Sequence, residues 1–177
     1  MHNSHKSVFE ECAPVVAVFG CGNTLLGDDG FGPTVIDALR GRDLPSGMCV
    51  EDVGTGLRDH LLDYLLLPAL RPGLLIVIDA VNEPGRRPGE LCERSPRQLP
   101  ANKRTDLSLH QFPDVNLLHE LQQAAGVDVL LLVVQAGAPD PRLDCGLSPA
   151  VAAAVDWACD RVLAAAGDHL AAGAVCR

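Results

Sequence analysis

Aromatic side chains and positive charge are both scarce in this sequence. Of its 177 residues only 3% are aromatic, and Lys plus Arg number 14 against 23 Asp plus Glu, so the formal net charge is −9. Affinity for phosphate backbones comes mainly from Lys and Arg, and stacking on bases needs aromatic rings. We therefore expect no nucleic acid partner.

Paired cysteines and long apolar runs are also missing. The seven cysteines form no C-x-x-C motif, and their number is odd, which argues against a structural zinc site and a secreted disulfide scaffold. The longest apolar runs, near 74–78 and 127–134, are far shorter than the ~20 residues of a membrane helix. Residues 1–14 lack the apolar core of a signal peptide. We expect a cytoplasmic protein with no membrane partner.

Short, continuous apolar runs predict strands buried on both faces, as in a parallel sheet. They cover 15–19, 74–78 and 129–134, with a weaker strand at 48–53 and a short edge strand at 90–93.

Helical patterns alternate with these strands. They cover 31–39, 57–67, 115–125 and 148–166, the last opening with Ser148 as N-cap and ending at Gly167. This alternation predicts an α/β fold, a single-domain, twisted, mostly parallel open sheet of about five strands with helices on both faces. We expect a flexible N-terminal segment 1–13, one domain over 14–167 and a C-terminal tail over 168–177.

A glycine-rich turn, GCGNTLLGDDGFGP over 20–33, follows the first strand and opens the first helix. Such a turn suggests a dinucleotide site, but Leu25 replaces the third glycine of that fingerprint. Asp28 and Asp29 would also repel a pyrophosphate at the helix start. Helix capping explains one of these carboxylates and leaves the other unexplained. A nucleotide- or phosphate-binding α/β protein remains one alternative.

Carboxylates also follow other predicted strands. Asp79 comes directly after 74–78, Asp29 lies at the corresponding end of the first strand, and Asp52 ends the second. Open α/β sheets bind ligands at this edge, although Asp79 could equally be a turn residue bonded to its own backbone. Among the histidines, only His110 is positioned to join Asp29 and Asp79. Two carboxylates and an imidazole suit Zn, Ni, Mn or Fe.

At these residues the sequence resembles the hydrogenase maturation proteases, the endopeptidases that trim the C-terminus of the large subunit of nickel–iron hydrogenases. The form of the glycine-rich turn is similar to the branch serving F420- or NAD-reducing cytoplasmic hydrogenases. The likeness covers most of the chain, in the order and spacing of segments 18–32, 52–55, 77–81, 108–110, 133–135 and 146–151.

The resemblance implies metal ligands at Asp29, where many members have Glu, and at Asp79 and His110. It implies that the nickel belongs to the precursor of the large subunit, which is the expected partner, and that cleavage requires it. Zn or Cd is expected to be able to occupy the site in the isolated protein. The resemblance implies an aspartic-type endopeptidase, for which the candidate catalytic residues are Asp52, Asp29 and Asp79, with Asp52 as a general base if burial raises its pKa. Whether metal or carboxylate performs the cleavage stays open.

A stretch rich in Pro, Gly and Arg, 82–106, interrupts the strand–helix rhythm and holds six of the 14 basic residues. Long loops in compact domains are often functional. We expect this loop to contact the precursor through side chains such as Arg86 and Arg87, with a solvated loop as the alternative. A non-catalytic, nickel-sensing docking or chaperone protein for the same precursor is the other alternative.

Overall fold

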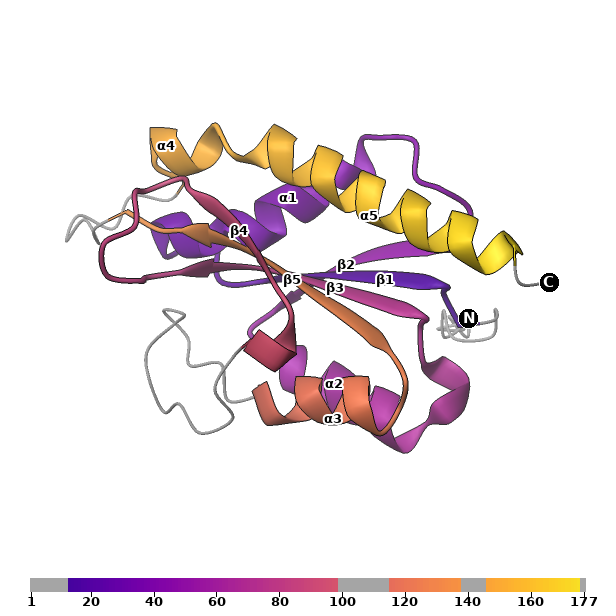
Figure 1. Ribbon diagram of the computed structural model, residues 1–177. Coiled ribbons are helices and arrows are strands. Elements are labelled where there is room, and N and C mark those ends of the chain that lie inside the picture. Colours follow the sequence, from indigo (N-terminus) through magenta and orange to yellow (C-terminus); the bar gives the residue numbers. More distant parts are fainter. Residues whose placement is uncertain (1–12, 99–114, 138–145, 176–177) are drawn as a thin grey trace, which may run out of the picture.

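A five-stranded sheet forms the centre of the protein (Figure 1), in a computed structural model that describes residues 13–98, 115–137 and 146–175. The strand order is β2-β1-β3-β5-β4. All neighbours run parallel except β4, which pairs antiparallel with β5. The strands are β1 Val16–Cys21, β2 Met48–Gly54, β3 Leu74–Val81, β4 Leu91–Arg94 and β5 Asp128–Gln135.

Helices cover both faces of this sheet (Figure 1). On one face lie α1 (Phe31–Arg40), the short α4 (Pro149–Ala152) and α5 (Val155–Val175). On the other lie α2 (Leu57–Leu66) and α3 (Val115–Gln123). The predicted α/β architecture, with about five mostly parallel strands and an edge strand near 90–93, is therefore confirmed.

The continuous apolar runs fill two separate cores. Successive side chains of a strand point to opposite faces, so Val16 and Val18 pack with α1 and α5, whereas Ala17 and Phe19 pack with α2 and α3. Every residue of β1 and of β3 is buried. This double coverage explains why neither strand alternates apolar with polar residues.

The last helical segment differs from the prediction of one helix that ends at Gly167. Ser148 is the N-cap, as predicted, but α4 ends at Ala152 and α5 then continues through Gly167 to Val175. A glycine inside a helix costs only about 1 kcal/mol. Leu170, beyond that glycine, packs against the α1 and α5 core, so tertiary contacts favour continuation of the helix.

No helix within the described residues is both long enough and apolar enough to span a membrane.

Candidate functional site

Asp29 and Asp79 meet at the carboxyl edge of the sheet. Asp29 lies in the 3-10 helix η2 (Gly27–Gly30) after β1, and Asp79 lies near the end of β3. Strands β1 and β3 are neighbours, with Gly20 opposite Ile78, as required for the two carboxylates to share one site. Both residues are buried, with exposed fractions of 0% for Asp29 and 6% for Asp79.

The closeness of the two carboxylates changes the chemistry of Asp79. Burial is the main cause that raises the pKa of Asp79 to about 8, and the negative charge of Asp29 raises it further. The main-chain N–H of Ala80 donates a 2.8 Å hydrogen bond to Asp79 Oδ1, which acts in the opposite direction. The local turn interaction considered for Asp79 is therefore present, and it accompanies the pairing with Asp29.

Glycines allow the start of α1 to approach the strands closely enough to form this site. A Cβ on Gly32 would lie 2.3 Å from the carbonyl oxygen of Cys21 and 2.7 Å from that of Ile78. A Cβ on Gly22, whose φ is +122°, would lie 1.8 Å from the carbonyl oxygen of Asp29. These glycines thus serve close packing within the chain, so the glycine pattern needs no bound nucleotide to explain it.

The carboxylate of Asp29 holds the turn that precedes it. Asp29 Oδ2 accepts a 2.7 Å hydrogen bond from the main-chain N–H of Asn23, and Asn23 Oδ1 in turn accepts one of 2.9 Å from Leu25. The main-chain N–H of Asp29 donates to the carbonyl of Leu26 at 3.3 Å. The candidate ligand and its loop therefore form one hydrogen-bonded unit.

Asp28 has a role that the sequence did not reveal. Its carboxylate caps neither η2 nor α1. Instead it accepts hydrogen bonds from the main-chain N–H groups of Gly137 and Ser148, at 2.8 and 2.6 Å, and from Ser148 Oγ at 3.0 Å. Asp28 thus ties the glycine-rich turn to the chain after β5 and to the start of α4.

Asp52 and His110 are the other two predicted site residues. Asp52 lies near the end of β2, opposite Gly20 and at the same edge of the sheet, but it is exposed. Its Oδ1 accepts a hydrogen bond from the main-chain N–H of Gly54 at 2.9 Å. The burial on which its role as general base depended is therefore not found. His110 lies outside the described residues.

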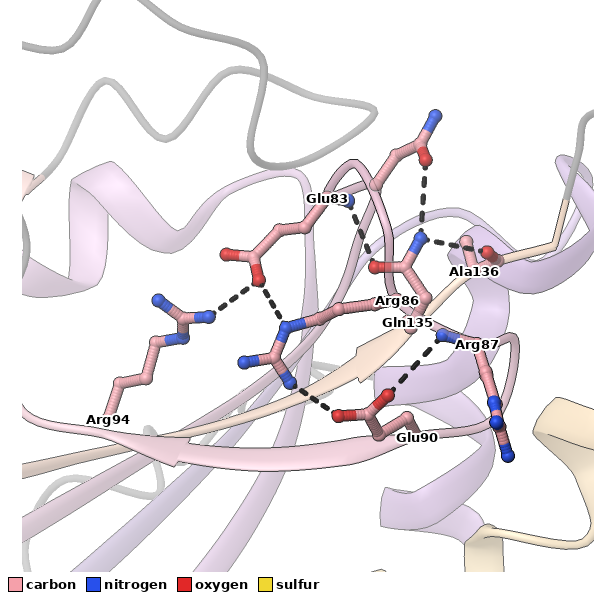
Figure 2. A network of polar contacts seen from close by, with 8 residues as sticks. Glu83, Arg86, Arg87, Glu90, Arg94, Gln135 and Ala136 are labelled. Carbon is pink, nitrogen blue, oxygen red and sulfur yellow. Dashed lines mark hydrogen bonds and ion pairs between the residues drawn. The ribbon is translucent and has the colours of Figure 1, made fainter.

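The beginning of the basic loop is fixed by a polar network around the buried Gln135 (Figure 2). Gln135 Oε1 accepts a 2.9 Å hydrogen bond from the main-chain N–H of Glu83, and its Nε2 donates to Asn82 Oδ1 at 3.3 Å. Gln135 directly follows the apolar run 129–134 within β5, and this polar residue at the end of a buried run was the sequence feature that could have indicated its role. The predicted loop 82–106 thus contains ordered structure, including β4 and the 3-10 helix η4 (Pro96–Gln98).

Ion pairs engage some of the loop arginines and not others. Arg86 pairs with Glu83 at 2.7 Å and with Glu90 at 2.9 Å, and Arg94 pairs with Glu83 at 2.6 Å. The side chain of Arg87 points away from this network (Figure 2), and it is exposed. Within the described part of the chain, its guanidinium takes part in no ion pair. Arg87 is therefore the better candidate for an external contact.

The donor set fits a divalent cation. Burial, and to a smaller extent the charge of Asp29, raises the pKa of Asp79, so a bound cation would compensate two carboxylates that are unfavourable to ionise together. Carboxylate oxygens suit Zn and harder divalent metals. In the described ranges no group of three His, Cys, Asp or Glu could hold a metal, and the predicted third ligand, His110, lies outside them.

Sequence comparisons place this chain among proteins of hydrogenase maturation. A family model described as hydrogenase maturation protease matches residues 33–165. The coenzyme F420 hydrogenase subunit delta of Methanothermobacter thermautotrophicus is 33% identical over 153 residues, covering 84% of this chain and 92% of that protein. A putative hydrogenase maturation protease of Methanocaldococcus jannaschii is 31% identical and covers 84% of this chain and 94% of its own length.

Solved structures share the fold. The hydrogenase maturating endopeptidase HybD from Escherichia coli superimposes with a TM-score of 0.69 at 28% identity, covering 86% of this chain and 92% of that one. A hydrogenase 2 maturation peptidase from a Thaumarchaeota archaeon gives a TM-score of 0.58 at 33% identity, with coverage of 86% and 97%.

Proposed function

This chain belongs to the hydrogenase maturation protease family, and on that premise we propose that it removes a C-terminal peptide from the nickel-loaded precursor of a [NiFe] hydrogenase large subunit. Membership makes it a peptide-bond hydrolase that acts on hydrogenase large subunits. The dependence on nickel and the removal of a C-terminal peptide are our proposal. The observation that supports it best is the buried pair of Asp29 and Asp79 at the carboxyl edge of the sheet.

In this proposal the nickel is part of the substrate. Asp29 and Asp79, together with His110, would hold the metal already inserted in the precursor. A nickel ion in this position can polarise the scissile carbonyl or activate a water molecule. A precursor without nickel would offer no cation to the two carboxylates, so the pair would discriminate loaded from empty precursor. Zn or Cd would bind the same oxygens in the isolated protein.

Asp52 is proposed to act as a general base. Its exposure leaves its carboxylate accessible to water at the same edge as Asp29 and Asp79, so we propose that it accepts a proton from a nearby water molecule. Its hydrogen bond from Gly54 holds one carboxylate oxygen in place. The variant Asp52→Asn keeps that acceptor oxygen and removes the base, which makes it the appropriate test.

The hydrogenase served is proposed to be of the F420- or NAD-reducing kind. The form of the glycine-rich turn suggested this branch. The relative from Methanothermobacter thermautotrophicus carries the name coenzyme F420 hydrogenase subunit delta, which supports the same assignment.

The intact mass of a large-subunit precursor tests the proposal. The precursor is incubated with this protein, with and without prior loading of nickel, and analysed by mass spectrometry. Loss of a C-terminal peptide only from the loaded precursor is the expected result. Binding without any mass change would instead support the non-catalytic docking protein.

Two variants control this experiment. Asp79→Asn should abolish the mass change while the protein stays folded. Asp37→Asn provides the matched control, because Asp37 is an exposed residue of α1 whose ion pair within the described residues is with Arg40. If Asp79→Asn cleaves at the normal rate, the assignment of the site is wrong.

A further inference from the structure

Two large apolar side chains lie exposed on the turn that carries Asp29. Leu25 is 62% exposed and Leu26 is 42% exposed. Both precede η2 directly, and the main chain of this turn is hydrogen-bonded to the carboxylate and to the main-chain N–H of Asp29. The exposed leucines and the candidate nickel ligand therefore belong to one local unit.

The exposure of the leucines is a fixed property of the turn. Besides the bonds to Asp29, Leu25 donates its main-chain N–H to Asn23 Oδ1 and Leu26 donates to the carbonyl of Asn23 at 3.0 Å. Gly30 packs closely against this turn, since a Cβ there would lie 2.9 Å from the Cα of Thr24. The turn thus exposes two leucine side chains to water, which is unfavourable in free energy. Binding of an apolar surface to these side chains would remove this unfavourable exposure.

We infer that Leu25 and Leu26 form a docking surface for apolar side chains of the precursor's C-terminal segment, and so determine substrate recognition. The inference rests on the proposed function. The chemistry of the occupant follows from the turn, where both exposed side chains are apolar. The nearby carboxylate of Asp28 is already occupied by Gly137 and Ser148. Because the main chain of the turn is hydrogen-bonded to Asp29, a segment docked on these leucines would lie beside the candidate nickel ligand.

A second pair of leucines provides a matched control. Leu66 and Leu67 are 73% and 49% exposed at the C-terminal end of α2. Because α2 begins after the carboxyl end of β2 and runs back along the sheet (Figure 1), this pair lies at the opposite edge from Asp29. Both pairs are adjacent and similarly exposed, so the same substitutions test position alone.

Cleavage kinetics on the nickel-loaded precursor test the inference. The double variant Leu25→Ser/Leu26→Ser should raise KM about tenfold or more, since it removes apolar area from the complex, while kcat and the thermal midpoint change little. The double variant Leu66→Ser/Leu67→Ser should match the wild type. Leu25→Met/Leu26→Met, which preserves the apolar surface, should restore KM.

Other outcomes separate this inference from the proposed function. If the wild type cleaves and the Leu25/Leu26 serine variant has the same KM, or if it lowers kcat alone, docking by these leucines is wrong and the protease assignment stands. If the wild type does not cleave, the proposed function fails, and the affinity of both double variants for the immobilised precursor tests docking separately. A change of oligomeric state confined to the Leu25/Leu26 serine variant would identify a self-association surface and overturn the inference.

Discussion

The carboxylate of Asp28 accepts two hydrogen bonds from Ser148, one from its main-chain N–H at 2.6 Å and one from its hydroxyl at 3.0 Å. These residues are 120 positions apart. Ser148 is the N-cap of α4, yet its hydroxyl makes no capping hydrogen bond to that helix. The neighbouring aspartates therefore divide two tasks, because Asp28 holds the helix start in place while Asp29 faces Asp79.

We expect Asp28→Ala to destabilise the protein by about 2 kcal/mol, because three donors on Gly137 and Ser148 lose a charged acceptor. Ser148→Ala removes only the hydroxyl donor and should cost less, about 1 kcal/mol. Chemical denaturation of the two variants measures the difference. Equal losses for the two variants would show that the main-chain hydrogen bonds to Asp28 contribute nothing to stability.

Gly22→Ala should be among the most destabilising single substitutions in the protein, by roughly 2 kcal/mol or more. The new Cβ would lie 1.8 Å from the carbonyl oxygen of Asp29, at a φ of +122°. The same substitution at Gly167 has no atom within 4 Å of the new Cβ. Since Gly167 lies inside α5, we expect Gly167→Ala to stabilise the protein by about 0.5–1 kcal/mol. Thermal unfolding of both variants checks the opposite signs.

Sequence patterns predicted the buried strands and the position of the site, but they did not predict contacts between residues that are distant in the sequence. Apolar runs such as 74–78 identified the buried strands, and the positions of Asp29 and Asp79 after two of them predicted one site, because parallel strands end at the same edge. Gly167 was misread as a helix end, since the packing of Leu170 that continues α5 depends on distant residues. The contact between Asp28 and Ser148 likewise could not be predicted from a local sequence pattern, because the two residues are 120 positions apart.

Arg87 and Arg86 should respond differently to charge reversal. Arg87→Glu changes an exposed side chain that points away from the polar network (Figure 2), so we expect weaker binding of the precursor with unchanged stability. Arg86→Glu breaks ion pairs with Glu83 and Glu90 and should loosen the loop itself. Binding to immobilised precursor and thermal unfolding, measured for both variants, separate the two effects. Unchanged affinity in Arg87→Glu would mean that this loop is simply solvated.

The contribution of Asp79 to the stability of the protein without metal should fall as pH rises. Burial and the charge of Asp29 raise the pKa of Asp79 from 3.8 to about 8. Below about pH 4 this carboxyl is protonated in both the folded and the unfolded state, and its full contribution to stability is present. Between about pH 4 and 8 the unfolded state ionises while the folded state retains the proton, so stability is lost across this window.

Asp79→Asn should remove this dependence and raise the stability near neutral pH. The amide oxygen of Asn can still accept the hydrogen bond from Ala80, and the side chain carries no charge to bury. One group contributes at most about 1.4 kcal/mol per pH unit, so the advantage of the variant in unfolding free energy should grow by up to that amount per unit between about pH 5 and 7. Urea denaturation of both proteins in a chelator gives this difference directly, and the titrating groups distant from Asp79 cancel in the comparison. An advantage that stays constant with pH would show that Asp79 ionises normally in the folded protein, and that its pairing with Asp29 places no demand for a cation on the site.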